Sequence, residues 1–520
     1  MAYNPKTGKG LGRFYSAEHR AFRAREWRGF RDTFYDFFRW LYLYGFMAAK
    51  LGCHPILMVK AMLRYRWMVS YLTASHMVDR HTMGLRGKEL RYAHNQFFSV
   101  LHNSVLGVRD IIVRDKNLRP NSKRAAKLRE NTVMFDEMTP HLIMMGFPTV
   151  KWIDIAMFAV GLPSEVDQNA SMFYIDAMEH LGLPADVCSR CAAETGVALD
   201  DAFPLFGKAM ISTNMPCNAS EATSMFQRRR IGLPDFQATM AMIHNEPAAH
   251  PYSAQVLQDC IDFVEKEYGV KYDWNALFKR AKHMNEQNRL ELEKWDYFKT
   301  PYCPMTGINE TLYRLYAWAS VNGLEDYFTK NDRKVMKILR KCYKNKYVPY
   351  GGTTRHRAFL WGPSAVYYTD FPTWTQNCWG INIVLNMDST MGHNMINTTD
   401  PEQALQDLAA FSEKGTMRHM AVGGWDNVNS VWEWAKNFNC DMVLMNDNIA
   451  CKGMLGVHAM MEEQARDLGF HFIFIEHDLQ DCRTVSRQDM RNCVNQYMAV
   501  VLNEKPLDPT LVEFDDSAAY

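Results

Sequence analysis

The chain has 520 residues, which is too long for one ordinary hydrophobic core and predicts two or three domains. Its 59 Lys and Arg residues balance 58 Asp and Glu residues, so the net charge of +1 gives no global electrostatic argument for binding nucleic acid. Twelve cysteines are too few for a disulfide scaffold and no signal peptide is recognisable, so we expect a cytoplasmic location in which cysteines are free to hold metal.

The beginning of the sequence differs from the rest, and we expect a helical N-terminal region over 1–143. Aromatic, aliphatic and basic residues alternate at helical spacing over 33–77 and 88–113. The most apolar run, 40–49, is too short to span a bilayer. Such helices are marginal alone, so we expect them to pack on the rest of the protein or on a partner subunit. A membrane is not expected as a partner, because the aromatic residues are spread too evenly to leave a clean polar face.

Alternating helical and β-type segments predict a first α/β domain over 144–250. Residues 208–213 are typical of a short strand, the next loop contains Cys217, and 220–230 has the pattern of a charged helix. A Gly-Leu-Pro turn then leads into a strand expected over 236–243.

A second domain repeats this arrangement. Residues 251–349 are predicted to form a helical connecting section, and 350–520 a second α/β domain with a C-terminal helix. Within it, a strand at 442–445 is followed by a loop with Cys451 and a helix over 454–468. The expected fold class is therefore α/β, with two open Rossmann-like parallel-sheet domains, a helical connection and an extra helical N-terminal region.

Cys217 and Cys451 lie in equivalent loops, where a side chain is held at the carboxyl edge of a parallel sheet beside a helix N-terminus. The helix dipole favours a thiolate there, which can bind a metal or act as a nucleophile. One such cysteine could equally be a small buried residue at a tight turn, but two in equivalent loops are difficult to explain as core residues. Cys188 and Cys191 form a CxxC pair, which indicates a redox dithiol or half of a zinc site.

Three segments carry a resemblance to a known family: DVCSRCAAETGVAL at 186–199, TNMPCN at 213–218, and the long stretch 446–486 that begins NDNIACKGMLG. In order and spacing they resemble the larger catalytic subunit (the alpha-type subunit, or D-component) of the 2-hydroxyacyl-CoA dehydratase and benzoyl-CoA reductase family. The resemblance covers about 145–502 and includes GVKYD at 269–273.

The resemblance implies that Cys188, Cys217 and Cys451 hold a 4Fe-4S cluster, whereas Cys191 has no counterpart in the family pattern. Three thiolate ligands would leave one iron open to substrate. The resemblance also implies a smaller homologous subunit, in a heterodimer or a dimer of heterodimers, and an ATP-dependent iron-sulfur activator protein.

The implied activity is elimination of water from a 2-hydroxyacyl-CoA by a ketyl-radical mechanism after one-electron reduction by the activator. The chain has no Walker A motif, which is consistent with a recipient of electrons. An aryl-CoA (benzoyl-CoA type) reductase is an alternative, because IEHDLQDCR at 475–483 is slightly closer to the reductase version. A non-catalytic iron-sulfur electron-transfer subunit would use the same cysteines without an acyl pocket.

Two departures from the family pattern concern the substrate pocket. FPTVKW at 147–152 lacks the acid of the corresponding family turn, and in GLPSEV at 161–166 Glu165 takes the place of a second family glutamate. Glu165 is therefore our candidate catalytic residue, as a polar contact to substrate. It could equally be a plain carboxylate at a helix N-terminus.

Overall fold

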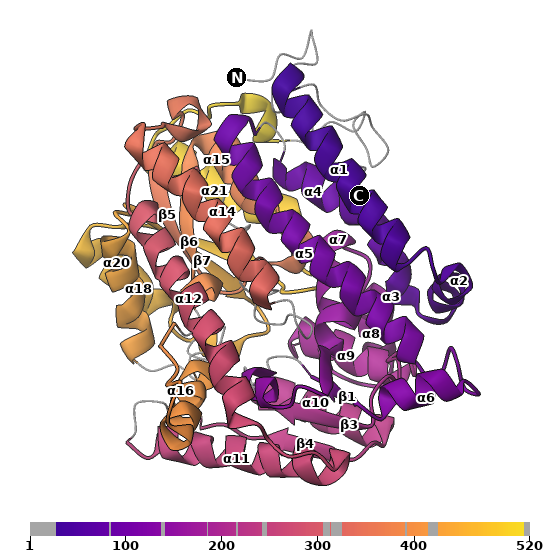
Figure 1. Ribbon diagram of the computed structural model, residues 1–520. Helices are drawn as coiled ribbons and strands as arrows, with labels where there is room; N and C mark the ends of the chain where they lie inside the picture. The colour runs from indigo at the N-terminus through magenta and orange to yellow at the C-terminus, as the bar shows by residue number, and fades with distance from the viewer. Residues whose placement is uncertain are drawn as a thin grey trace.

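A computed structural model gives the fold (Figure 1). The structure describes residues 28–513, apart from 83–84, 137–140, 185, 215–216, 242–246, 305–312, 314–324, 391–392 and 414–424. Two four-stranded parallel sheets are surrounded by helices, so the predicted α/β class is confirmed.

The first sheet has the strand order β2-β1-β3-β4, with every pair parallel. Its strands are β1 (Thr132–Phe135), β2 (Lys151–Asp154), β3 (Ala209–Thr213) and β4 (Asp235–Ala238). β4 is shorter than the strand expected over 236–243, of which 242–243 lie outside the described residues. β1 falls inside the region predicted to be helical, because a four-residue apolar strand is too short to stand out from helical periodicity.

The second sheet repeats this topology as β6-β5-β7-β8. Its strands are β5 (His356–Trp361), β6 (Ile381–Asn386), β7 (Met442–Asn448) and β8 (His471–His477). In both sheets the first strand lies between the second and the third. The strand order therefore switches from one side of the sheet to the other between the first and third strands. Ligands of open α/β sheets bind at the carboxyl ends of the strands beside such a switch point.

Helices and helical turns cover both sheets, because each sheet has two apolar faces to bury. Around the first sheet lie η3 (His141–Gly146), η4 (Met157–Gly161), α7 (Leu162–Val166), α8 (Met172–His180), α9 (Ser189–Leu199) and α10 (Asn218–Ile231). Around the second lie η5 (Pro349–Gly352), η6 (Val366–Tyr368), α15 (Phe371–Trp379), η7 (Met387–Thr390), α16 (Pro401–Glu413), α18 (Trp425–Asn437), α19 (Lys452–Leu455), α20 (His458–Leu468), α21 (Arg487–Gln496), η8 (Tyr497–Val501) and η9 (Pro509–Leu511).

The connecting helices tie the two units together. They are α11 (Ala249–Tyr268), α12 (Trp274–Phe298) and α14 (Glu325–Lys344). α11 packs against α16 of the second unit, and α12 packs against α14. The Asn285 amide of α12 also donates to the Ile396 carbonyl at 2.8 Å.

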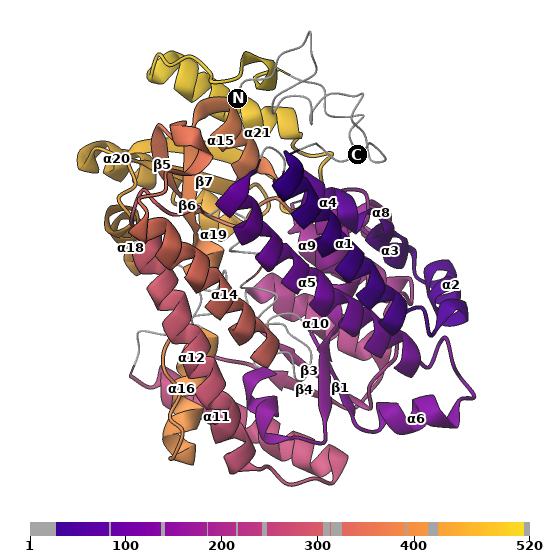
Figure 2. The same ribbon diagram turned by 45° about the horizontal axis from the view of Figure 1, so that its top comes forward.

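The N-terminal helices form a separate layer at one side of the molecule (Figures 1 and 2). They are α1 (Phe30–Lys50), α2 (Pro55–Arg64), α3 (Arg66–Val69), η2 (Ser70–Thr73), α4 (Ala74–Thr82), α5 (Gly87–Arg114) and α6 (Lys123–Arg129). α5 is buried along most of its length and packs on α1, α4 and α14. No single helix in the described ranges is long and apolar enough to cross a membrane, although α1 and α2, which meet at 93°, pass that test when taken together.

Candidate functional site

Cys217 and Cys451 occupy the same place in the two repeated sheets. β3 and β7 are each the third strand of their sheet, and a loop at the carboxyl end of each leads to the cysteine. Cys217 is the N-cap residue of α10, and Cys451 is the N-cap residue of α19. The structure therefore has the strand, loop and helix setting predicted for both, at the switch point of each sheet.

Cys188 lies at a third helix start, as the N-cap residue of α9. Two contacts bring its loop against the loop of Cys451. The Asn448 amide nitrogen lies 3.9 Å from the Cys188 sulfur, and Lys452 Nζ lies 3.1 Å from an Asp186 carboxylate oxygen. The two α/β units thus meet where their cysteine loops meet.

The three thiols act on one another electrostatically. Burial raises the pKa of both Cys217 and Cys451, while backbone N–H groups at the starts of their helices oppose the shift. Charge on Cys188 raises both pKa values further, and charge on Cys217 also raises the pKa of Cys451. A cation held among the three sulfurs would remove this repulsion.

Cys191 belongs to the surroundings of Cys188. Its buried thiol donates a hydrogen bond to Cys188, which lowers the pKa of Cys188 and raises that of Cys191 well above its ordinary value. Backbone N–H groups of Cys191 and Arg190, at the start of α9, lower the pKa of Cys188 further, against its burial. Cys188 is therefore the most readily ionised of the three predicted ligands.

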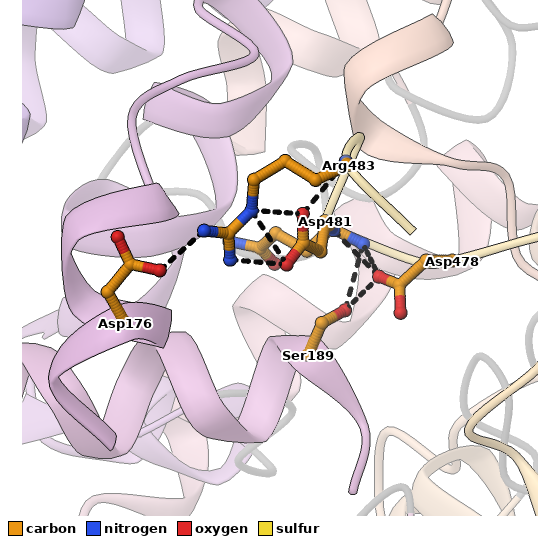
Figure 3. Close-up of polar contacts among 6 residues, drawn as sticks. Asp176, Ser189, Asp478, Asp481 and Arg483 are labelled. Carbon is orange, nitrogen blue, oxygen red and sulfur yellow. Dashed lines mark hydrogen bonds and ion pairs between the residues drawn. The ribbon is translucent and has the colours of Figure 1, made fainter. Parts of the chain in front are cut away.

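A buried polar contact fixes the start of α9 to the second unit (Figure 3). The Ser189 hydroxyl donates to the Asp478 carboxylate and accepts from the backbone N–H of Gln480 at 3.0 Å. Asp478 and Gln480 follow β8, whereas Ser189 directly follows Cys188. These contacts hold Cys188 in position relative to the second sheet.

The same loop after β8 makes two further contacts with the first unit. Arg483 pairs with Asp481 at 2.6 Å and with Asp176 of α8 (Figure 3). The Gln480 amide donates to the Ser164 hydroxyl of α7 at 2.8 Å. We call this set of contacts, Ser189–Asp478–Gln480–Ser164 and Asp481–Arg483–Asp176, the seam.

Asp447 is a buried acid near the carboxyl end of β7, four residues before Cys451. Neither of its carboxylate oxygens has a hydrogen-bond partner in the described part of the chain. Burial, with a contribution from the charge of Glu476, raises the pKa of Asp447 to about 6. Such a group can hold a proton close to neutral pH.

Glu165 lies in α7, buried between the N-terminal region and the second unit. Burial, and then the charge of Glu165, raises the pKa of Tyr71 in η2, and α7 packs against η2. α7 also packs against η6 of the second unit. In the structure, Cys188, Cys217 and Cys451 are thus close enough for their charges to affect one another's pKa, and we call them one electrostatic group. Glu165 has Tyr71 as a neighbour.

The three thiols do not have the close spacing of a single-ion site. Four-coordinate zinc holds sulfur ligands at about 2.3 Å, which requires the sulfurs to crowd together. Among the described residues, only His356, Asp441 and His471 bring three ligand atoms within 4.8 Å of one another. These residues lie at the amino ends of β5, β7 and β8, away from the cysteines. His356 contacts Asp441 at 2.7 Å and Glu504 at 2.9 Å, and these carboxylates raise its pKa, so the group is explained as an ion-pair network.

Asn448, Ser189 and Asp478 are site residues that the sequence analysis did not single out. Asn448 and Asp478 are polar residues directly at the end of apolar strands, a pattern that could have marked them. Their partners Cys188 and Ser189 are more than 250 positions away along the chain. Sequence spacing alone could not identify those pairs.

The chain matches a known protein family. The model of the family described as 2-hydroxyglutaryl-CoA dehydratase, D-component, matches residues 157–497, which is more than half of the chain. The match includes all three candidate cysteines and the seam, and it begins after the N-terminal helices. No curated protein matches the sequence.

Proposed function

The chain belongs to the family of the 2-hydroxyglutaryl-CoA dehydratase D-component, and from this premise we propose that it is the iron-sulfur catalytic subunit of a 2-hydroxyacyl-CoA dehydratase-like enzyme. The observation that carries the proposal is the meeting of the Cys188 and Cys451 loops across the two units, with Cys217 in the same electrostatic group. With this arrangement, the chain has three thiols available for one shared centre.

In the proposal, Cys188, Cys217 and Cys451 hold a 4Fe-4S cluster. When bound, such a cluster supplies one electron and, at an iron without a protein ligand, a Lewis acid for the substrate. The helix N-termini at the three cysteines favour the thiolate forms that this requires. Asn448 and the Ser189–Asp478 pair would keep the Cys188 loop in place while charge on the centre changes.

The proposed reaction removes water from a 2-hydroxyacyl-CoA. One electron converts the thioester carbonyl to a ketyl radical, the hydroxyl group leaves from the α-carbon, a proton leaves from the β-carbon, and the electron is returned. We propose Asp447 as a group that can hold a proton near this site, and Glu165 as a polar contact to substrate. The net products are an enoyl-CoA and water.

We propose a smaller homologous subunit and an ATP-dependent iron-sulfur activator protein as partners. The smaller subunit would complete the substrate site, and the activator would deliver the electron. A cytoplasmic location suits this chemistry, because a reducing compartment keeps thiols available for iron.

The test is an anaerobic incubation of the chain with its smaller subunit, reduced activator and either a 2-hydroxyacyl-CoA or benzoyl-CoA. We expect an enoyl-CoA from the first substrate, no product with Cys217→Ser, and full product with the control Cys482→Ser, which changes a half-buried cysteine outside the proposed centre. A ring-reduced product from benzoyl-CoA would instead support the aryl-CoA reductase, to which 475–483 is similar. No product from either substrate would contradict a catalytic role and favour the electron-transfer subunit.

A further inference from the structure

The outward face of α1 is apolar along nearly its whole length. Trp40 and Leu43 point inward and are buried, and α1 packs on α5 with this side. Between residues 34 and 49 the exposed positions carry no charge at all. The large exposed side chains are Phe30, Phe34, Phe37, Phe38, Leu41, Tyr42 and Tyr44. They form a continuous stripe, because their spacing follows the helical repeat.

The apolar face continues over the next helix. In α2, Ile56 and Leu63 are 71% and 83% exposed, and Val59 between them is 57% exposed. We call the exposed apolar side chains of α1 and α2 the α1–α2 face. A soluble monomer rarely leaves so many large apolar side chains together in water, so this face indicates a binding surface.

The charges beside the α1–α2 face are positive. Over residues 30–64 the acids are Asp32 and Asp36, and both are paired toward the interior, with Arg91 at 2.8 Å and Arg28 at 3.4 Å. The exposed charged groups of the same stretch are cationic: Arg31, Lys60 and Arg64. The surface around the apolar stripe therefore favours an anionic partner.

A basic cavity opens at the start of α1, next to Phe30. Its volume is about 450 Å³, and its charged lining among the described residues consists of Arg28, Arg31, Lys88, Arg91 and Lys341, with Asp32 as the one acid. Burial, and then the charges of Lys341, Arg91 and Arg31, lower the pKa of Lys88. The five cations of the lining outnumber its one acid.

Two long helices also begin at this cavity. Gly29, Phe30 and Arg31 belong to the start of α1, and Gly87 and Lys88 to the start of α5. The N-terminus of α1 adds positive potential to that of the side chains, whereas at the start of α5 the backbone N–H of Gly87 already donates to Asp32 at 2.8 Å. The cavity thus has the chemistry of a phosphate site, and Phe30 joins it to the α1–α2 face.

We propose that the α1–α2 face and the adjoining basic cavity bind the surface of an anionic phospholipid bilayer. The aromatic and aliphatic stripe would enter the interfacial layer, and a lipid phosphate would occupy the cavity. This departs from the expectation that no membrane is involved. That expectation assumed an even spread of aromatic residues, whereas the structure turns Trp40 inward and leaves one apolar face.

Two other occupants fit the charges less well. Residues 1–27 carry six basic residues, Lys6, Lys9, Arg13, Arg20, Arg23 and Arg25, against Glu18 and Glu26, so as a cover they would bring like charge to the basic cavity. A second copy of the chain would likewise place one cationic surface against another. An anionic bilayer has an apolar interior for the aromatic and aliphatic stripe and negative charge for the cationic groups beside it.

The proposal is tested by co-sedimentation of the full chain with vesicles of phosphatidylcholine alone or with phosphatidylglycerol. We expect binding to the anionic vesicles, reduced about tenfold or more by Leu41→Glu and by Lys88→Glu. Leu468→Glu is the matched control, because Leu468 is 43% exposed on α20 at the other side of the molecule, and it should bind as the unaltered chain does (Figure 1).

Three results would overturn the proposal. One is no binding to anionic vesicles, and another is equal loss of binding in Leu41→Glu and Leu468→Glu. The third is a dimer in sedimentation velocity that Leu41→Glu dissociates, since the α1–α2 face would then be an interface between copies. Because none of these residues belongs to the cysteine site, the outcome is independent of the proposed dehydratase activity.

Discussion

Asp447 is the most unusual single residue of the site, because its carboxyl group is fully buried at the end of β7 and has no hydrogen-bond partner among the described residues. Its pKa of about 6 lies above the ordinary carboxyl value, so the folded chain binds a proton that the unfolded chain releases between about pH 4 and pH 6. The stability of the protein should therefore fall as pH rises through this window.

Replacing Asp447 with Asn removes this titration and keeps the shape of the neutral carboxyl group. We expect Asp447→Asn to be more stable than the unaltered chain at pH 7, by roughly 1–3 kcal/mol, and to match it near pH 4. Urea unfolding at a series of pH values measures the difference. A stability difference that does not change with pH would show that folding does not raise the pKa of Asp447.

At the residue scale, the sequence predicted the strand, loop and helix setting of Cys217 and Cys451 but not the residues that contact the Cys188 loop. The settings of Cys217 and Cys451 could be located because a short apolar strand, a loop and a helical pattern follow one another over 208–230 and over 442–468. Asn448 contacts Cys188 and Asp478 accepts from Ser189, and these pairs come together only when both units have folded. No local pattern encodes such a contact.

Among the secondary-structure elements, the loop after β5 sets the shape of the site beside Cys451. Gly362 has φ of +96°, and a Cβ there would lie 2.1 Å from the backbone oxygen of Asn446 in β7. The chain can pass β7 at this distance only with glycine. The close approach keeps the carboxyl ends of β5 and β7 together, which is where the switch point lies.

Gly362→Ala should therefore destabilise the protein by more than about 2 kcal/mol. The matched control is Gly182→Ala, since Gly182 has a similar φ of +92° with open space around it, and should cost about 1 kcal/mol. Chemical denaturation of both variants separates the steric clash from the backbone strain. Equal losses would mean that the approach to Asn446 is not tight.

The N-terminal elements give a second prediction. α5 is buried between α1, α4 and α14, so removal of residues 1–130 would uncover the apolar side of α14 and of the first unit. We expect the truncated chain to be insoluble or deficient in iron. A truncated chain that stays soluble, retains its iron and loses only vesicle binding would contradict this expectation.

The strands also show what sequence patterns can and cannot reveal about elements. β7 was predicted because the apolar run 442–445 stands before a loop and a clear helix. β1, with only four residues, was missed within a helical region, although it lies at the centre of the first sheet and pairs with both β2 and β3. Its role is fixed by long-range pairing, which the local sequence does not record.

At the scale of the whole molecule, two sheets of the same topology meet at their cysteine loops. α16 of the second unit packs on α11, and the seam joins the chain after β8 to α7, α8 and α9. The two units are thus held together at two places, the α11–α16 contact and the seam. Such an arrangement can hold a shared centre without either unit enclosing it alone.

We expect the chain to need its smaller subunit for activity, because the family to which it belongs contributes one component of a dehydratase. Sedimentation equilibrium combined with the dehydration assay tests this. The chain alone should show no more than residual turnover, and addition of the smaller subunit should restore it. A fully active monomer would contradict the proposed assembly.

The most direct test of the central claim is the iron and sulfide content of the anaerobically purified chain and its cysteine variants. We expect iron and sulfide in a ratio near one, with absorption that bleaches on reduction, and loss of iron in Cys188→Ala, Cys217→Ala and Cys451→Ala. Cys191→Ala, Cys440→Ala and Cys482→Ala should retain it, because these cysteines are not proposed ligands. If all six variants kept full iron content, Cys188, Cys217 and Cys451 would not hold the cluster, and the account of the site would be wrong.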